Sequence, residues 1–177
     1  MSAASTRSIV TRRLVLEPLD ASHATAMFAG MSDPQLFRWL DDVHPPTAAA
    51  LALRYARITA PGAGAPDRWL NWAMRLREGG DYAGHVEVTL HPDGVANLAY
   101  FTFTQFMQRG LAREACAAVL DVLRDDFDAH EVVATMDVRN VASWKLVESL
   151  GFVRDPDTEP SSLRGVTTED YRYRRLL

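Results

Sequence analysis

Alternation of apolar and polar residues predicts strands in the middle of the chain. Three segments alternate in this way: Trp69–Arg77, Ala83–Leu90 and Val95–Phe103. The first two are separated by Gly79-Gly80-Asp81, and the last two by His91-Pro92-Asp93-Gly94. Both separators are typical turn sequences, so the pattern predicts an antiparallel meander of three strands.

The spacing of apolar residues changes after Gly110. Apolar side chains then recur every three or four residues as far as Phe127, which predicts an amphipathic helix. A β-branched strand, a second helix that closes at a glycine, and two closing strands are expected next. Their ranges are Glu131–Val138, Asn140 or Ser143 to Leu150–Gly151, Phe152–Arg154 and Thr167–Arg174.

The N-terminal third favours one strand followed by helices. The expected ranges are a strand over Ile9–Glu17, a helix from Asp20 or Ser22 to Met31, a helical turn from Asp33-Pro34, a helix over Ala48–Thr59 and a surface loop over Pro61–Pro66. The order of elements indicates an α+β fold with a mixed sheet and at least one crossover unit. With 177 residues, the chain is expected to form a single domain over residues 1–177.

Composition narrows the function classes. A formal net charge of −4 argues against a nucleic-acid binder, and the apolar runs are too short to span a membrane. The polar start Met1–Ser8 lacks the apolar core of a secretory signal, so a cytoplasmic location is expected. Cys116 is the only cysteine and falls in the apolar helix pattern, which indicates a buried hydrophobe rather than a nucleophile or metal ligand.

The chemistry-bearing segment is Tyr100–Ala115, where a strand ends, a loop turns on Gly110 and a helix begins at once. The first N–H groups of such a helix lack internal partners and attract a phosphate or diphosphate. Arg109 and Arg113 add positive charge nearby. Many helices begin after glycine without binding an anion, so the loop alone leaves a purely structural role open.

The loop Met107-Gln108-Arg109-Gly110-Leu111-Ala112 resembles the acyl-CoA loop of the GNAT superfamily of N-acetyltransferases, Gln/Arg-x-x-Gly-x-Gly/Ala, although Met107 departs from it at the first position. The RimJ/RimL-like branch often carries an apolar aromatic residue there. The other matches to that branch are Arg12–Leu16, Leu98–Phe101, Ala112–Ala115, Asn140–Ser143 and Leu150–Phe152.

The resemblance implies a GNAT-like fold, with a mostly antiparallel sheet of about seven strands flanked by about four helices. It also implies acetyl-CoA as cosubstrate and no metal. Backbone groups of one strand end would pair with the pantetheine arm. Loop amides would hold the diphosphate, an asparagine would bind the pantetheine amide, and a serine would lie near the sulfur. These positions are Phe101, Thr102, Phe103, Gln108, Arg109, Gly110, Leu111, Ala112, Arg113, Asn140 and Ser143.

Candidates for proton transfer are less distinct. Many family members carry a glutamate before the loop and a tyrosine in the second helix, whereas this chain has Ala96–Asn97 and Val147 there. Ser143 is the substitute near the sulfur, with a plain helix cap as its alternative. Glu87 and His85 lie on the polar side of the neighbouring strand pattern, where solvent exposure is expected and a proton relay is the alternative. Asp137 at the end of a strand is a third candidate for the relay.

The sequence is compatible with three functions. The first is a bacterial acetyltransferase acting on a protein N-terminal α-amine or another primary amine by direct attack. Since an α-amine titrates near a pKa of about 7.7–8.0, it needs less help from a base than a lysine. The second is a small-molecule acetylase, and the third is an acyl-CoA sensor without turnover. Specificity for the amine acceptor is expected to reside in Asp20–Pro66, but the sequence of this segment does not identify the acceptor. A homodimer is left open.

Overall fold

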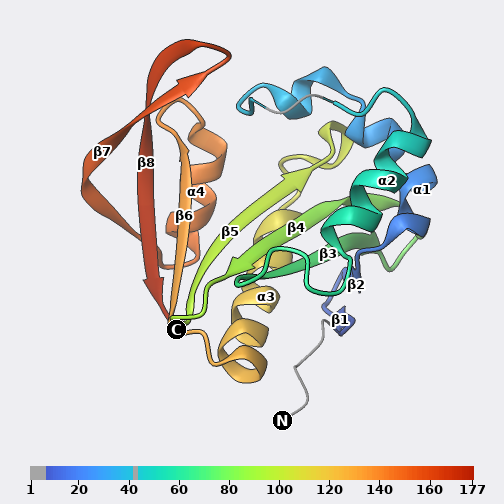
Figure 1. Ribbon diagram of the computed structural model, residues 1–177, viewed down its shortest axis with the longest axis horizontal. Coiled ribbons are helices and arrows are strands. Elements are labelled where there is room, and N and C mark those ends of the chain that lie inside the picture. Colours follow the sequence, from blue (N-terminus) through green and yellow to red (C-terminus); the bar gives the residue numbers. More distant parts are fainter. Residues whose placement is uncertain (1–6, 42–43) are drawn as a thin grey trace.

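The computed structural model describes residues 7–41 and 44–177; the segments 1–6 and 42–43, including most of the polar start, lie outside the described residues. Eight described strands form one mixed sheet in the order β1-β2-β3-β4-β5-β6-β8-β7, one more than expected (Figure 1). The strands are β1 (Ile9–Val10), β2 (Leu14–Pro18), β3 (Arg68–Leu76), β4 (Tyr82–Leu90), β5 (Val95–Thr102), β6 (Glu131–Asp137), β7 (Val153–Leu163) and β8 (Val166–Leu176).

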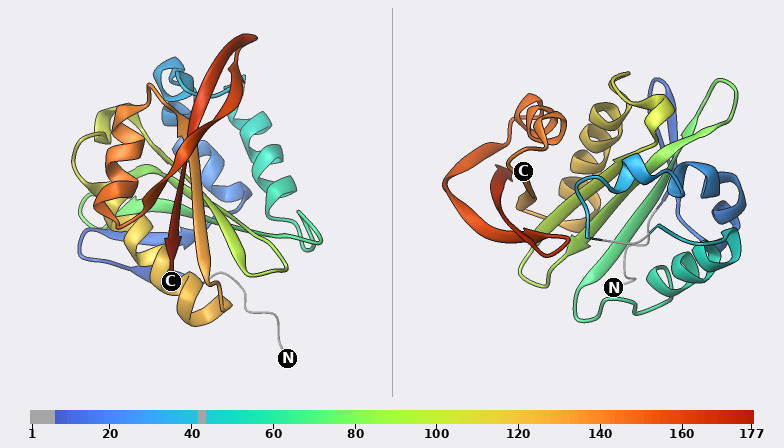
Figure 2. Two further views of the ribbon diagram at one scale, coloured as in Figure 1. Left: turned by 90° about the vertical axis from the view of Figure 1, so that its left-hand side faces the viewer. Right: turned by 90° about the horizontal axis from the view of Figure 1, so that it is seen from above.

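The four described α-helices cover both faces of the sheet. They are α1 (Ala24–Met31), α2 (Ala48–Ile58), α3 (Leu111–Phe127) and α4 (Val141–Ser149). Three short 3₁₀ turns accompany them, η1 (Ala21–His23), η2 (Pro34–Phe37) and η3 (Thr104–Phe106). Figure 2 shows α1 and α2 on one face and α3 and α4 on the other. The α+β class and the mostly antiparallel sheet are confirmed.

The predicted meander is confirmed as β3, β4 and β5, with Leu70 opposite Val88 and Val88 opposite Leu98. Its apolar residues pack against α3, whose Cys116 is completely buried. Burial raises the pKa of the Cys116 thiol well above its ordinary value, which agrees with a structural role. Trp72 is fully buried in the core, whereas Trp69 remains partly exposed.

Two sequence expectations at the ends of the sheet are corrected. The single opening strand is a short hairpin of β1 and β2, because the chain turns at Thr11, whose N–H donates to the Leu14 carbonyl. The closing strand expected to end at Arg154 continues as β7 to Leu163. Its register shifts between Arg154 and Thr158, and most of its side chains are exposed on both faces, so the strand shows no alternation for sequence analysis to detect.

The sheet splits between β5 and β6. These strands run parallel and pair at three positions only, Val95 with Glu131, Ala96 with Val132 and Asn97 with Val133. Beyond Asn97, β5 stays paired with β4 and β6 stays paired with β8, so the two halves diverge (Figure 1). The split leaves the β6-facing edge of β5, from Leu98 to Thr102, without a strand partner among the described residues.

Two kinds of feature are absent from the described residues. None of their helices combines the length and apolarity that a membrane-spanning helix requires. Nor do three or more of their His, Cys, Asp or Glu side chains converge in a way that could hold a metal ion.

Candidate active site

The unpaired edge of β5 directs backbone hydrogen-bonding groups into the gap that the split opens between β5 and β6. The Phe103 N–H donates to the Ala83 carbonyl of β4 at 2.8 Å. Because backbone groups alternate in direction along a strand, those of Phe101 also face β4, whereas those of Tyr100 and Thr102 face the gap. The backbone groups of Phe101 and Phe103 are thus directed to β4, and those of Thr102 and Tyr100 lie at the open edge.

The loop after β5 ends at an open helix N-terminus. Gln108 and Gly110 both adopt positive φ, 59° and 72°, and Gly110 occupies the N-cap position of α3 without a side chain to block it. The Gly110 carbonyl accepts from the Glu114 N–H at 3.1 Å, which closes the first helical turn. The N–H groups of Leu111, Ala112 and Arg113 precede that bond and lie at the positive end of the helix dipole.

The side chains of the two loop arginines are already engaged. The Arg109 guanidinium lies over the Phe106 ring, 5.4 Å from its centroid. Arg113 donates from Nε to the Ser149 hydroxyl at 3.1 Å, which ties α3 to the end of α4. A third arginine, which sequence analysis did not single out for this role, contacts the loop directly: Arg13 Nη1 donates to the Arg109 carbonyl at 2.8 Å.

The start of α4 faces the gap from the other side. The Asn140 side-chain oxygen accepts from the Ser143 N–H at 3.4 Å and so caps the helix. The Tyr100 hydroxyl donates to the Ser143 carbonyl at 3.0 Å, which connects β5 to α4 across the split. Burial raises the pKa of Tyr100, so its hydroxyl keeps its proton and remains a donor.

Asp137 and Arg139 form a structural ion pair beside α4. Arg139 donates from Nε and Nη2 to the two oxygens of Asp137, at 2.8 and 2.6 Å, and Thr168 donates to the same carboxylate. These contacts, above all the hydrogen bonds from Arg139, hold the pKa of Asp137 far below its ordinary value. Asp137 therefore stays ionised and fully engaged, which argues against a role as a proton relay.

His85 and Glu87 form a pair on the α1–α2 face of β4. Contrary to the expected solvent exposure, His85 is only 1% exposed, because α2 covers it and the Phe101 ring stacks on it at 4.5 Å. His85 Nε2 lies 3.0 Å from Glu87 Oε1. Glu87 is half-buried and stands opposite Ala99, which lies beside the start of the split. Sequence periodicity places these residues on one face but cannot show what covers that face.

A cavity of about 690 Å³ opens on the same face of the sheet, with Glu87 on its wall. Its lining comes from β4, β5, β6 and β8 and includes Ala99, Thr135 and Arg172. Arg172 and its neighbour Arg174 pair with carboxylates of β7 and β6. The cavity therefore connects the Glu87 carboxylate with a polar, solvent-open surface.

The open end of the split is bridged by a segment that we call the strap, residues 34–41. Figures 1 and 2 show it passing above the diverging strands toward the tip of the β7–β8 hairpin. Arg164 at that tip donates from Nη2 to the Phe37 carbonyl at 2.7 Å, and its N–H donates to the Asp41 carboxylate. The Arg139 guanidinium lies over the Trp39 ring at 5.3 Å. The strap thus connects α1 to the β7–β8 hairpin and to the segment between β6 and α4.

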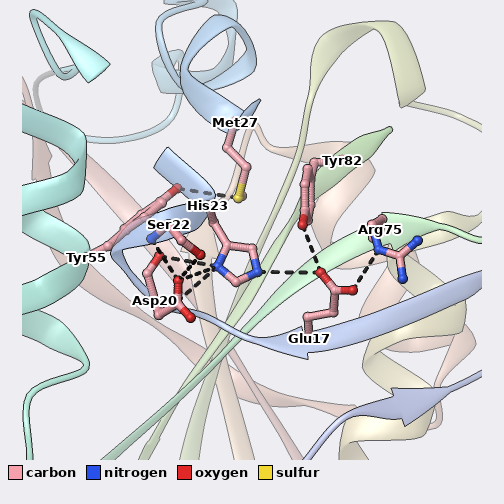
Figure 3. A network of polar contacts seen from close by, with 8 residues as sticks. All are labelled: Glu17, Asp20, Ser22, His23, Met27, Tyr55, Arg75 and Tyr82. Atoms are coloured by element: carbon pink, nitrogen blue, oxygen red, sulfur yellow. Dashed lines mark hydrogen bonds and ion pairs between the residues drawn. The ribbon is translucent and has the colours of Figure 1, made fainter. Parts of the chain in front are cut away.

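A polar network anchors the start of α1, which leads into the strap (Figure 3). Glu17 accepts from Arg75 Nε at 2.7 Å and from the Tyr82 hydroxyl at 2.8 Å, and His23 Nε2 lies 3.5 Å from the same carboxylate. Burial by itself raises the pKa of Glu17, but the donated hydrogen bonds outweigh it and leave that pKa below its ordinary value. The network holds α1 against β2, β3 and β4.

A split sheet, a free strand edge and an open helix N-terminus at the end of that strand together present backbone groups that suit an extended ligand with a diphosphate. Such an arrangement is typical of acyl-CoA-dependent transferases. A family model described as an acetyltransferase (GNAT) domain matches residues 13–153. The chain therefore belongs to the GNAT acetyltransferase family and is an N-acetyltransferase by class.

Several solved structures share this fold. RimL, a ribosomal L7/L12 α-N-protein acetyltransferase in complex with coenzyme A, superimposes with a TM-score of 0.85 at 17% identity, covering 97% of this chain and 98% of RimL. A ribosomal-protein-S5-alanine acetyltransferase from Vibrio fischeri gives 0.80 at 17%, covering 97% of each chain. A GCN5-related N-acetyltransferase from Brucella melitensis gives 0.81 at 20%, covering 98% of this chain and 80% of that one. At these identities the likeness concerns the fold alone.

Proposed function

We propose that residues 1–177 act as one domain that transfers an acetyl group from acetyl-CoA to a primary amine, either a protein N-terminal α-amine or a small molecule. The observation that carries this proposal is the β5–β6 split, whose free edge at Tyr100 and Thr102 leads to the open N-terminus of α3. The similarity to RimL, which was solved with coenzyme A, supports the same cosubstrate.

The binding residues follow from these positions. Tyr100 and Thr102 present backbone groups that pair with the amides of a pantetheine arm, as an added strand would. The amides of Gln108 to Arg113 hold the diphosphate, with those of Leu111, Ala112 and Arg113 at the positive helix end. Asn140 uses its side-chain oxygen as a cap, and its amide nitrogen is the group proposed to bind the ligand. When bound, acetyl-CoA supplies a thioester carbonyl activated toward amine attack.

Glu87 and Ser143 are proposed to handle the protons from opposite faces of the sheet. Tyr100 reaches Ser143 on the α3–α4 face, and successive strand residues point to opposite faces, so Ala99 and its partner Glu87 lie on the α1–α2 face. Glu87, held by His85, accepts the proton that the attacking amine loses. Ser143 donates a proton toward the departing sulfur and takes up a proton from water in the same step. The amine forms the new C–N bond as the C–S bond breaks.

The first experiment combines calorimetry with acetyl-CoA and a thiol-release assay over a panel of amines and peptides. We expect Gly110→Val to weaken acetyl-CoA binding about tenfold or more, because a β-branched residue is strained at positive φ. Gly80→Val is the matched control, since Gly80 has a φ of 78° in the β3–β4 turn with open space around it. Equal affinities for the wild type and Gly110→Val would contradict the loop assignment.

A sensor without turnover is the second candidate. It is favoured by Val147, which is fully buried at the position where many relatives carry a tyrosine, and by Ala96–Asn97 in place of a glutamate. Tight acetyl-CoA binding with no thiol release from any amine would select this reading. We propose a bacterial cytoplasmic protein in either case, and light scattering distinguishes a monomer from a homodimer.

A further inference from the structure

A carboxylate lies on the first turn of the helix that is proposed to bind the diphosphate. Glu114 follows Gly110 by one helical turn, and its side chain is 17% exposed. A negative charge at this end of a helix stabilises the helix but repels an anionic ligand, and partial burial limits screening by salt. The site therefore needs a compensating charge if it is to attract a diphosphate.

The compensating groups come from the turn between β1 and β2, about one hundred residues away in the sequence. Glu114 Oε1 accepts from the Thr11 hydroxyl at 2.6 Å and from the Arg13 N–H at 2.7 Å. Glu114 Oε2 accepts from Arg13 Nε at 2.6 Å. Both carboxylate oxygens are thus engaged, and one guanidinium lies directly against the negative charge.

The other side of the same guanidinium contacts the loop. Arg13 Nη1 donates to the Arg109 carbonyl at 2.8 Å, and Nη2 lies 3.5 Å from the position that a Cβ on Gly110 would occupy. When the Arg109 carbonyl is held toward Arg13, the peptide plane between Arg109 and Gly110 is fixed. Because the amides that follow continue from that plane, Arg13 also fixes the direction in which they point.

We propose that Arg13 is a positioning residue for the cosubstrate loop, which cancels the charge of Glu114 and orients the Arg109–Gly110 peptide so that the α3 N-terminus accepts a diphosphate. This inference rests on the proposed acetyl-CoA site. It is distinct from the roles of Arg109 and Arg113, whose guanidinium groups contact Phe106 and Ser149 instead.

The test measures the dissociation constant of coenzyme A by calorimetry at low salt. Arg13→Met leaves the Glu114 charge uncompensated, and we expect it to weaken binding by about tenfold, within the range for a charge at a helix terminus. The double variant Arg13→Met/Glu114→Gln removes that charge but keeps an acceptor for Thr11. It is expected to recover at least half of the lost binding free energy. High salt is expected to shrink the difference between the wild type and Arg13→Met.

Arg77→Met is the matched control, because Arg77 Nη1 donates to the Thr11 and Arg12 carbonyls of the same turn but does not reach the loop. We expect its affinity for coenzyme A to equal that of the wild type. Thermal melts identify any variant that fails to fold; if Arg13→Met does, Arg13→Lys takes its place as the variant that retains charge but loses the forked contact, with an intermediate loss expected.

The outcomes separate the two claims. A wild type that binds no coenzyme A overturns the proposed function itself. If the wild type binds and Arg13→Met or its replacement binds equally well, only this inference is overturned. A double variant that binds no better than Arg13→Met, or a loss that is independent of salt, assigns Arg13 a merely structural role and also overturns it.

Discussion

The Tyr100 hydroxyl donates to the Ser143 carbonyl at 3.0 Å, and this hydrogen bond connects β5 to α4 across the β5–β6 split. On either side of it lie the two groups that the proposed reaction needs, the free edge of β5 and the first turn of α4. The bond therefore fixes Ser143 relative to the strand that is proposed to hold the pantetheine arm.

Tyr100→Phe tests that connection. Loss of one buried hydrogen bond costs about 1 kcal/mol of folding stability. We expect about a fivefold lower kcat/KM for acetyl transfer if the whole cost falls on the active geometry. Urea unfolding and thiol release measure the two effects. Tyr171→Phe is the control, because Tyr171 contacts Tyr173 and Arg154 through its ring; equal losses in both variants would contradict the positioning role.

Ser143→Ala is expected to slow turnover while leaving the affinity for acetyl-CoA unchanged. The helix cap uses the backbone N–H of residue 143 and the Asn140 side chain, so removal of the hydroxyl leaves the cap in place. We expect turnover to fall about tenfold, less than a dedicated acid would lose, because water replaces a small hydroxyl. Single-turnover thiol release measures the rate, and a full-rate variant would remove Ser143 from the mechanism.

Glu87→Gln is expected to lower kcat/KM about a hundredfold, within the usual range for a general base. Glutamine keeps the size and an oxygen at the His85 contact, so the stability is expected to change little. Glu78→Gln, an exposed change in the β3–β4 turn, is the control. The decisive readout is the pH profile of kcat/KM. We expect the variant to lose the part of the pH dependence that the Glu87 carboxylate contributes, and an unchanged profile would assign the base to another group.

Arg164→Asn tests the strap. Asparagine tolerates the positive φ of 53° at this position, so the hairpin tip is retained while the contact with the Phe37 carbonyl is lost. Because the strap bridges the open end of the split, we expect the KM for the amine acceptor to change severalfold, at the scale of about 1 kcal/mol for one hydrogen bond. The affinity for acetyl-CoA serves as the internal control. A change confined to acetyl-CoA binding would argue against a role of the strap in binding the amine acceptor.

The Glu17 network predicts a pH dependence of stability. The folded-state pKa of Glu17 is depressed below its ordinary value of 4.5, so its contribution is present above that pH and is lost as the pH falls through the folded-state value. Glu17→Gln is therefore expected to cost about 1 kcal/mol of unfolding free energy at pH 7, and progressively less below about pH 4.5. Urea titrations at several pH values measure this. A difference that stays constant with pH would contradict the assignment.

The sequence pattern by itself predicted the secondary structure of the central part of this protein. Alternation over β3, β4 and β5 and helical spacing over α3 identified elements whose one-sided burial imposes a period, and Gly110 marked the strand-to-helix junction. The family resemblance then led to the proposal of acetyl-CoA as the cosubstrate. The long β7 gave no such signal, because a strand exposed on both faces imposes no alternation on its residues.

Only the tertiary structure decided which side chains meet. It buried His85 under α2 and Phe101, turned the backbone of Phe101 and Phe103 toward β4, and brought Arg13 to Glu114 and to the loop. The physical reason is that local periodicity records which face of an element is apolar, a property of neighbouring residues. Contacts between elements far apart in the chain depend instead on strand order and on the divergence of β5 from β6, which no local pattern encodes.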